Sequence, residues 1–196
     1  MRPSEKIDAC GASHRRLERA VASLTDDDVR APSLLPGWSR GHVLTHLAHK
    51  TLTHVWLMGG AEVNEVREQY PSGLDQAHAE VEAGAGRPAD VLREELIRSF
   101  ADFEAAVERL EDDHWKRVGI CVPGPRSMAD IMGRHLRDAE AHHVDLDIGY
   151  RPSDWPPLFV EGELAKRLAD LPNRADHAAL LAWLLGRDEA PVLGPW

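Results

Sequence analysis

Apolar residues return at every third or fourth position over four long stretches of the chain. The clearest stripes cover residues 4–24 and 89–112, and two more cover 40–68 and 127–149. This spacing places the apolar side chains on one face of a helix, and Ser39 supplies an N-cap for the 40–68 helix. Four long amphipathic helices joined by short breakers predict a mainly α protein built as a four-helix bundle.

Shorter elements are expected in the connections. The acidic run at 26–28 should end the first helix, and Gly59-Gly60 should kink or fray the second. A short helix is expected to end near Ala83, and residues 118–122 should form a short extended piece.

A proline-rich linker at 151–157 separates the bundle from the end of the chain. Two further helices are predicted beyond it, over 158–170 and 175–186. The sequence therefore predicts two domains. Residues 1–150 form the bundle, and residues 151–196 form a small C-terminal appendage, helical or α+β.

Composition excludes several classes of function. The formal net charge of −10 argues against a nucleic-acid partner, because nucleic-acid binders usually carry a basic face. The N-terminus has no apolar segment of the signal type, and no run of 18 apolar residues exists, so no membrane partner is expected. The two cysteines are far apart and form no CxxC motif, which favours the reducing cytoplasm over a disulfide-bonded exterior.

Histidines carry most of the candidate chemistry. Seven of the eleven lie in two helical stretches, four between residues 42 and 54 and three between 135 and 143. Histidines and carboxylates recur there at i, i+3, i+4 and i+7, which stacks side chains on one helical face. Two facing helices that present imidazoles inward are a common way to hold a divalent metal.

One stripe on the 127–149 helix begins apolar and continues with His135, Asp138, His142 and Asp145, so it is expected to point inward. Buried Asp and His need partners, because an unpaired buried charge costs several kcal/mol, and a metal is an efficient partner for both. On the 40–68 helix a second polar face is shared by His42, His46, His49 and Thr53.

One or two histidines from the 40–68 helix, with Asp138 and His142, would make a set of two histidines and one carboxylate that leaves coordination positions open. The alternative is that the two helices are simply solvated, with Glu140, His143 and Asp147 exposed, and that the Asp/His pairs are plain hydrogen-bonded pairs.

Other reactive side chains are expected to be structural. His14 fits a satisfied core histidine or a group that orients a metal ligand. Cys10 and Cys121 fit buried small hydrophobes rather than nucleophiles, because no histidine adjoins either in sequence. Trp38 fits a core anchor at the start of the 40–68 helix.

Two motifs resemble a known family. LPGWSRGHVLTHLA at 35–48, followed about ninety residues later by RDAEAHHVDL at 137–146, is similar to the mycothiol-dependent maleylpyruvate isomerases, which belong to the DinB-like metal-binding helical bundles. The resemblance covers residues 1–150 and continues through ALLAWLLGR at 179–187 and the terminal Gly-Pro-Trp. It implies an actinobacterial, cytoplasmic enzyme that uses a divalent metal, expected to be zinc, and the thiol mycothiol.

The resemblance also implies the site residues. Its metal ligands fall on His46, Asp138 and His142, with Asp138 in place of the family's usual glutamate. Glu140 with His143 is the competing pair, and its i,i+3 spacing fits the motif less well. A substrate-binding arginine falls on Arg187, whereas the second position expected to hold arginine is Ala77 in this chain.

The implied chemistry is thiol addition to a double bond. Zinc holds mycothiol as a thiolate, the thiolate adds to maleylpyruvate, and rotation followed by elimination gives fumarylpyruvate. The expected partners are therefore a small-molecule substrate and a low-molecular-weight thiol. Two alternatives remain, a mycothiol S-transferase acting on another electrophile and a non-catalytic metal-binding bundle, and the oligomeric state stays open.

Overall fold

The protein divides into two compact units, Met1–Asp154 and Trp155–Trp196. The structure is a computed structural model that describes residues 2–193. Each unit is compact in itself. The structural division falls a few residues after the sequence-based boundary at residue 150.

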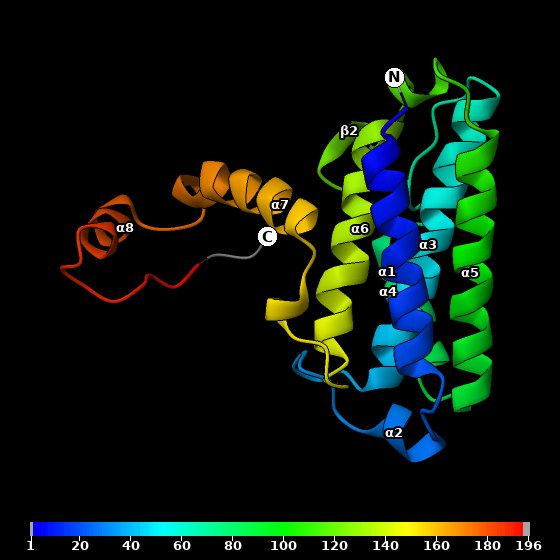
Figure 1. Ribbon diagram of the computed structural model, residues 1–196, viewed down its shortest axis with the longest axis horizontal. Helices are drawn as coiled ribbons and strands as arrows, with labels where there is room; N and C mark the ends of the chain where they lie inside the picture. Colours follow the sequence, from blue (N-terminus) through cyan, green and yellow to red (C-terminus); the bar gives the residue numbers. More distant parts are fainter. Residues whose placement is uncertain (1, 194–196) are drawn as a thin grey trace. The chain divides into compact units, whose positions relative to one another are not determined.

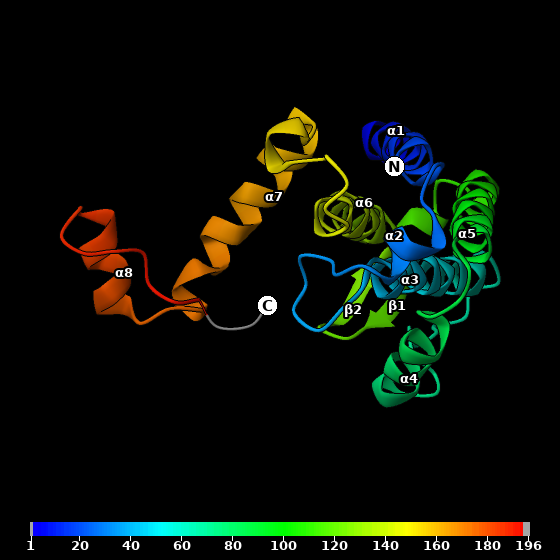
Figure 2. The same ribbon diagram turned by 90° about the horizontal axis from the view of Figure 1, so that it is seen from below.

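The first unit is a four-helix bundle, as the apolar stripes predict. Its long helices are α1 (Ser4–Val21), α3 (Arg40–Glu62), α5 (Ala89–Arg109) and α6 (Met128–Asp145). Seen along the bundle, they form a ring in which α3 packs on α5 and α6, and α1 packs on the other side of both (Figure 2). The apolar stripes therefore meet along the axis of the bundle.

A long crossover makes α3 and α5 parallel neighbours. The start of α3 lies beside the end of α6, because Arg40 Nε donates to Leu146 O at 2.6 Å. The start of α5 lies at the same end, where Ala89 N donates to Asp26 Oδ1 at 2.8 Å. The chain returns from the far end of α3 (Figure 1) through α4 (Leu74–Gly84), which packs on the outside of α3 (Figure 2).

The short elements differ in part from the sequence-based expectation. The acidic run that was expected only to end a helix begins α2 (Asp26–Arg30), because Thr25 and Asp28 form a capping box. Helix α3 ends at Glu62 rather than near residue 68, soon after its paired glycines. A 3-10 turn, η1 (His114–Lys116), leads from α5 to the strands.

An antiparallel hairpin closes the end of the bundle where α5 ends and α6 begins. It joins β1 (Val118–Cys121), which the sequence predicts, to β2 (Gly124–Ser127), which it does not. Pro125 lies within β2, and proline normally argues against a strand. This edge position tolerates it, because β1 is its one partner in the described sheet.

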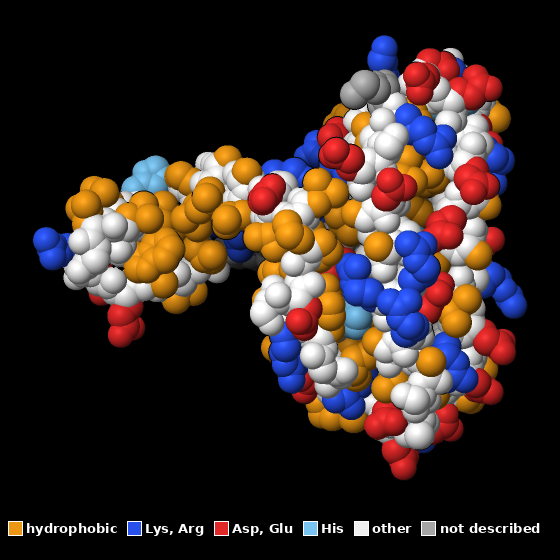
Figure 3. Space-filling model, in the orientation of Figure 1, with side chains coloured by type: hydrophobic (Ala, Val, Ile, Leu, Met, Phe, Trp, Pro, Cys, Tyr) orange, Lys and Arg blue, Asp and Glu red, His pale blue; other side chains and the backbone are white. Residues whose placement is uncertain are grey.

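The second unit is helical in its described residues, with no strand, so the helical form of the predicted appendage is confirmed. It contains α7 (Pro157–Asp170), η3 (Leu171–Asn173) and α8 (His177–Leu184), and η2 (Pro152–Asp154) ends the first unit. Many large apolar side chains of α7 and α8 are exposed (Figure 3). The terminal Gly-Pro-Trp motif lies outside the described residues.

In the described part of the chain, no helix combines the length and the apolar character that a membrane crossing requires.

The bundle core contains a chain of hydrogen-bonded histidines with one member on each of three helices. His14 Nε2 of α1 lies 2.7 Å from His135 Nε2 of α6, and His135 Nδ1 lies 3.2 Å from His54 Nδ1 of α3. At the outer end, His14 Nδ1 lies 2.8 Å from Glu104 Oε1 of α5. The three histidines are at most 2% exposed. The prediction that His14 is a satisfied core histidine is confirmed.

The acceptor at the outer end fixes the tautomers. The hydrogen bond from His14 lowers the pKa of Glu104, so its carboxylate only accepts. His14 then donates through Nδ1, His135 donates through Nε2 and His54 donates through Nδ1. His54 Nε2 is left as a buried lone pair with no hydrogen-bond partner among the described residues.

Burial keeps His54 and His135 uncharged. Desolvation lowers the pKa of His54 to about 3 and holds the pKa of His135 well below its ordinary value. His14 and His135 also stack on aromatic rings of α5, with centroids 4.0 Å from Phe100 and 3.7 Å from Phe103. Neutral imidazoles therefore behave here as apolar rings that also hydrogen-bond.

The bundle should lose stability as the pH falls below about 6.5, the ordinary pKa of an unfolded histidine. His54 stays neutral in the folded protein until about pH 3. Between about pH 6.5 and pH 3, unfolding is therefore accompanied by the uptake of one proton. One such proton contributes a slope of about 1.4 kcal/mol per pH unit to the free energy of unfolding.

Replacing His54 tests this directly. In His54→Gln the slope between pH 4.5 and 6 should be smaller by about one proton, measured by chemical denaturation with a chelator present. His78→Gln, at an exposed position on α4, is the matched control and should keep the wild-type slope. A His54→Gln slope equal to that of the wild type would show that His54 is not a buried neutral group.

Candidate metal centre

The facing surfaces of α3 and α6 carry the predicted metal ligands. The stripe on α6 points inward as expected, since Met128, Ile131, His135 and Asp138 are buried. Further along α6, His142 is half-buried beside α3. Its ring meets that of His46 edge to face, with centroids 4.9 Å apart.

His46 is prepared to act as a ligand because it is neutral. Burial lowers its pKa to about 3, and the charge of His142 acts in the same direction, while the negative charge of Asp138 opposes both. Trp38 lies against the same ring, with centroids 5.3 Å apart. An uncharged imidazole is the form that binds metals.

Asp138 is a buried carboxylate with one oxygen occupied. Arg137 donates to Oδ1 from Nη2 at 2.8 Å and from Nε at 3.2 Å. Oδ2 is buried and has no hydrogen-bond partner among the described residues. Burial acts to raise the pKa of Asp138, but the charges of Arg137 and Lys50 outweigh it and hold the pKa below its ordinary value. An ionised oxygen left this way is costly, and a cation would satisfy it.

His142 is oriented by a carboxylate on its own helix. Its Nδ1 lies 2.8 Å from Asp145 Oδ2, so Nδ1 carries the proton and Nε2 keeps its lone pair. A carboxylate that orients a histidine in this way is the usual companion of a metal-bound imidazole. That Asp145 orients His142 was not predicted from the sequence, although its i,i+3 spacing from His142 signals the contact.

These three side chains fit a divalent metal. They offer two imidazole nitrogens and one carboxylate oxygen, a donor set that suits zinc or ferrous iron and leaves positions open for other ligands. The ligand atoms of the three residues are not all within 4.8 Å of one another, so metal binding would require their side chains to adjust.

In the described part of the chain, a group of three other side chains does have its possible ligand atoms within 4.8 Å of one another. Glu111, Asp113 and His114 lie on the surface between α5 and β1, and both acids are exposed. Asp113 pairs with Arg117 at 2.7 Å, and His114 Nδ1 accepts a hydrogen bond from the Glu111 backbone at 3.2 Å. Asp113 and His114 therefore already have partners, and the Glu111 carboxylate is exposed to water, so this group has less need of a metal than the buried Asp138 does.

The expectation that Glu140 and His143 could be exposed is wrong. Glu140 is fully buried and accepts hydrogen bonds from Arg16 of α1 and from the Tyr150 hydroxyl. His143 is 3% exposed and stacks on Tyr150 with centroids 4.0 Å apart. The competing pair therefore lies on the face of α6 toward α1, and its carboxylate is already paired.

The other histidines of the polar face of α3 contact α4 instead of α6. His42 Nε2 lies 3.3 Å from Glu82 Oε2, and His49 Nδ1 lies 3.7 Å from Glu80 Oε2. Because α4 takes up these two side chains, His46 is the member of that face that meets a histidine of α6.

Both cysteines are free and buried, as predicted. Burial raises the pKa of each thiol, and Cys10 Sγ donates to Met132 O at 3.6 Å. Neither thiol has the lowered pKa of a catalytic cysteine.

The two positions expected to bind substrate lie in different units. Ala77 lies on α4 in the first unit, and Arg187 follows α8 in the second. Gly186 has a φ of 65°, which fits the predicted turn after the helix. Arg187 is exposed, and among the described residues its guanidinium makes no ion pair with Asp188 or Glu189.

Comparisons with known proteins agree with this architecture. A sequence profile of the mycothiol maleylpyruvate isomerase N-terminal domain matches residues 10–147. The crystal structure of the mycothiol-dependent maleylpyruvate isomerase superposes with a TM-score of 0.80 at 21% identity, covering 85% of this chain and 69% of that one. A histidine-to-alanine mutant of a mycothiol-dependent maleylpyruvate isomerase also matches, at 20% identity with the same TM-score and coverage.

A more distant match is YfiT from Bacillus subtilis, a probable metal-dependent hydrolase with an unusual four-helix bundle topology. It has a TM-score of 0.61 at 18% identity and covers 85% of this chain and 87% of that one. No protein with a curated description matches the sequence. At these identities the solved structures establish the fold, and the profile, which spans well over half of the residues, establishes the family. The resemblance inferred from the two histidine motifs is therefore confirmed, and the chain belongs to the mycothiol maleylpyruvate isomerase family.

Proposed function

We propose that this protein is a metal-dependent enzyme that uses mycothiol to isomerise maleylpyruvate or a close relative, in the reducing cytoplasm where Cys10 and Cys121 stay free thiols. The observation that carries the proposal is the buried Asp138 oxygen without a partner, one helical turn from the contact between two histidines. Membership of the family supplies the thiol and the substrate class.

His46, Asp138 and His142 are the proposed ligands, with zinc as the proposed metal. Each has one donor atom free: the lone pair of neutral His46, Oδ2 of Asp138 and Nε2 of His142. When bound, zinc would lower the pKa of the mycothiol thiol and so supply the nucleophile. Asp145 holds the proton of His142 at Nδ1 and keeps Nε2 free for the metal.

The protein's own residues favour an external thiol as the nucleophile. Cys10 and Cys121 are buried, and burial raises their pKa values, so neither supplies a thiolate at neutral pH. The open positions of a site with three protein ligands would admit a sulfur ligand from outside.

The positions expected to bind substrate favour a second candidate reaction that also uses mycothiol. Arg187 is the proposed contact for an anionic end of the substrate, because its guanidinium is not engaged by neighbouring acids in the described residues. Ala77, however, offers no charge for a second carboxylate. A mycothiol S-transferase acting on a less anionic electrophile is therefore the alternative.

Metal content distinguishes the proposed ligands from the surface group. Wild-type protein dialysed against zinc should retain about one ion per chain, and His46→Ala should lose most of it, because two ligands hold a metal much less firmly than three. His114→Ala, which removes the histidine of the exposed group, should keep the wild-type content. Elemental analysis of the three proteins decides between them. Zinc lost from His114→Ala and kept by His46→Ala would place the metal at the surface.

Steady-state assays with mycothiol test the reaction. The zinc-loaded enzyme should isomerise maleylpyruvate in a reaction that requires mycothiol, and Arg187→Ala should lower kcat/KM about ten- to a hundredfold, the range for one lost charged hydrogen bond. Arg98→Ala, at an exposed position on α5, is the control. Conjugation of mycothiol to an uncharged electrophile without isomerisation would instead establish the transferase. If neither reaction occurs, the bundle is not a mycothiol enzyme.

A further inference from the structure

Lys50 is a cation without a counter-ion beside the proposed metal ligands. It lies on α3 four residues after His46 and is half-buried. Its ammonium donates one hydrogen bond, to the neutral Tyr70 hydroxyl at 3.1 Å, and lies 5.4 Å from the centre of that ring. Among the described residues, no carboxylate forms an ion pair with Lys50.

Tyr70 is held in place by the backbone that precedes it. Ile120 N of β1 donates to Arg67 O at 2.9 Å, and Gln69 N donates to Ile120 O at 2.8 Å. The side chain of Gln69 also donates to Thr53 Oγ1 of α3 at 2.9 Å. The segment that carries Tyr70 is therefore hydrogen-bonded to both the hairpin and α3.

Arg134 is a second cation without an ion-pair partner among the described residues. It lies on α6 four residues before Asp138, and its Nε is buried without a hydrogen-bond partner. In the part of the chain that the structure describes, its guanidinium makes no ion pair either. Arg16 and Arg87, which are also partly buried, do have carboxylate partners, Glu140 and Glu95.

The two cations face one region between α3, α6 and β1. Burial raises the pKa of the Cys121 thiol on β1, and the charges of Arg134 and Lys50 both act in the opposite direction. The same two charges add to the lowering of the pKa of His54 on α3. The geometry agrees, because Lys50 and Asp138 line one pocket between α3 and α6 and Arg134 lies one helical turn before Asp138 on α6.

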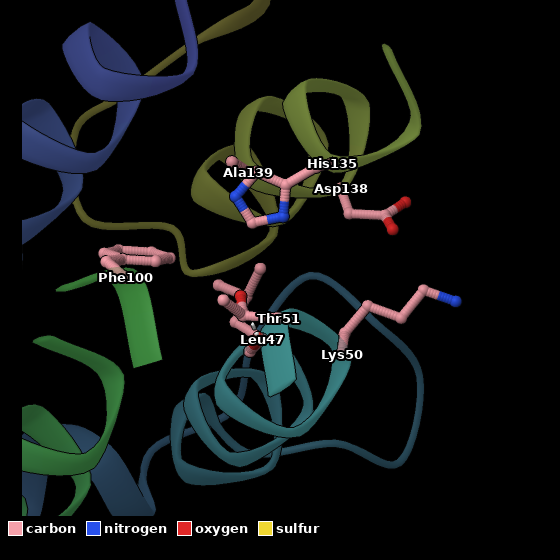
Figure 4. Close-up of a pocket in the computed structure, with 7 residues that line it drawn as sticks. All are labelled: Leu47, Lys50, Thr51, Phe100, His135, Asp138 and Ala139. Carbon is pink, nitrogen blue, oxygen red and sulfur yellow. Dashed lines mark hydrogen bonds between the residues drawn. The ribbon is translucent and has the colours of Figure 1, made fainter. Parts of the chain in front are cut away.

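Asp138 does not neutralise this pair. Its Oδ1 is taken by Arg137, and its Oδ2 has no partner. Lys50 and Asp138 line one narrow pocket with His135 and Thr51, and their charged ends extend to the same side of it, away from Phe100 (Figure 4). A divalent cation on Asp138 would add positive charge to this region, so an anion would be favoured there.

Each cation lies about one helical turn from a proposed metal ligand on its own helix, because four residues of α-helix rise by about 6 Å. An anionic group held by these cations would therefore lie about one turn from the proposed metal ligands.

We propose that Lys50 and Arg134 form a carboxylate-binding subsite for the electrophilic substrate, one turn from the metal ligands. This inference deepens the proposed function and rests on it for the nature of the substrate. The Arg134 guanidinium offers a planar fork of donors and the Lys50 ammonium a point charge, a combination that matches the two oxygens of a carboxylate.

Calorimetric titration with maleate, a stable short dicarboxylate, tests the subsite without turnover. Zinc-loaded wild-type protein should bind maleate and should not bind the uncharged analogue maleamide. Lys50→Met and Arg134→Met should each weaken maleate binding about ten- to a hundredfold, and Lys50→Arg should retain most of it. Lys116→Met and Arg98→Met, both at exposed positions, are matched controls with wild-type affinity. Zinc content and circular dichroism are measured on every variant, so that loss of ligands or fold is not mistaken for loss of the subsite.

The same titration on metal-free protein separates this inference from the proposed function. If the metal assignment is wrong but the subsite is real, maleate binding will be independent of zinc and still depend on Lys50 and Arg134. If the subsite is wrong, the Lys50→Met, Arg134→Met double variant will bind maleate as the wild type does, or the wild type will bind none in either form.

Discussion

Burial of a row of imidazoles and carboxylates between the helices is the constraint on which the bundle depends. Each of these groups has to be neutral or partnered, because an unpaired charge in the core costs several kcal/mol. Around His135, neutral imidazole rings hydrogen-bond to one another from α1 through α6 to α3, and they stack on aromatic rings of α5. One turn further along α6, the carboxylate of Asp138 remains ionised with one oxygen unpaired. The proposed metal ligands His46 and His142 lie on the same α3–α6 surface as that oxygen.

The helices were predictable because their apolar stripes are long and uninterrupted, and the inward stripe of α6 was predictable for the same reason. Strand β2 was missed because Pro125 argues against a strand and the pairing with β1 is a tertiary fact. Glu140 was misjudged because polarity in a sequence does not show that Arg16, more than a hundred residues away, lies opposite. The ligand assignment came from a motif, and spacing alone could not separate a metal pair from a hydrogen-bonded pair.

Electrostatics connects the fold to the proposed chemistry. The protein is acidic overall, yet the side of the α3–α6 surface near β1 carries Lys50 and Arg134 without carboxylate partners in the described residues. On the opposite face of α6 the pattern reverses, and Glu140 is fully paired with Arg16 and Tyr150. One face of α6 is therefore internally paired, whereas the other carries the unpartnered Asp138 oxygen and the two cations on which the proposed metal and anion sites rest.

X-ray absorption at the zinc edge of the metal-loaded protein examines the α3–α6 site most directly. With His46, Asp138 and His142 as ligands, the zinc shell should contain two imidazole nitrogens at about 2.0–2.1 Å and oxygen ligands, with no sulfur in the resting protein, and should gain one sulfur at about 2.3 Å after mycothiol is added. A shell dominated by carboxylate oxygens with one imidazole would contradict the pairing of His46 with His142. A resting shell that already contains sulfur would contradict the assignment of both cysteines to the core.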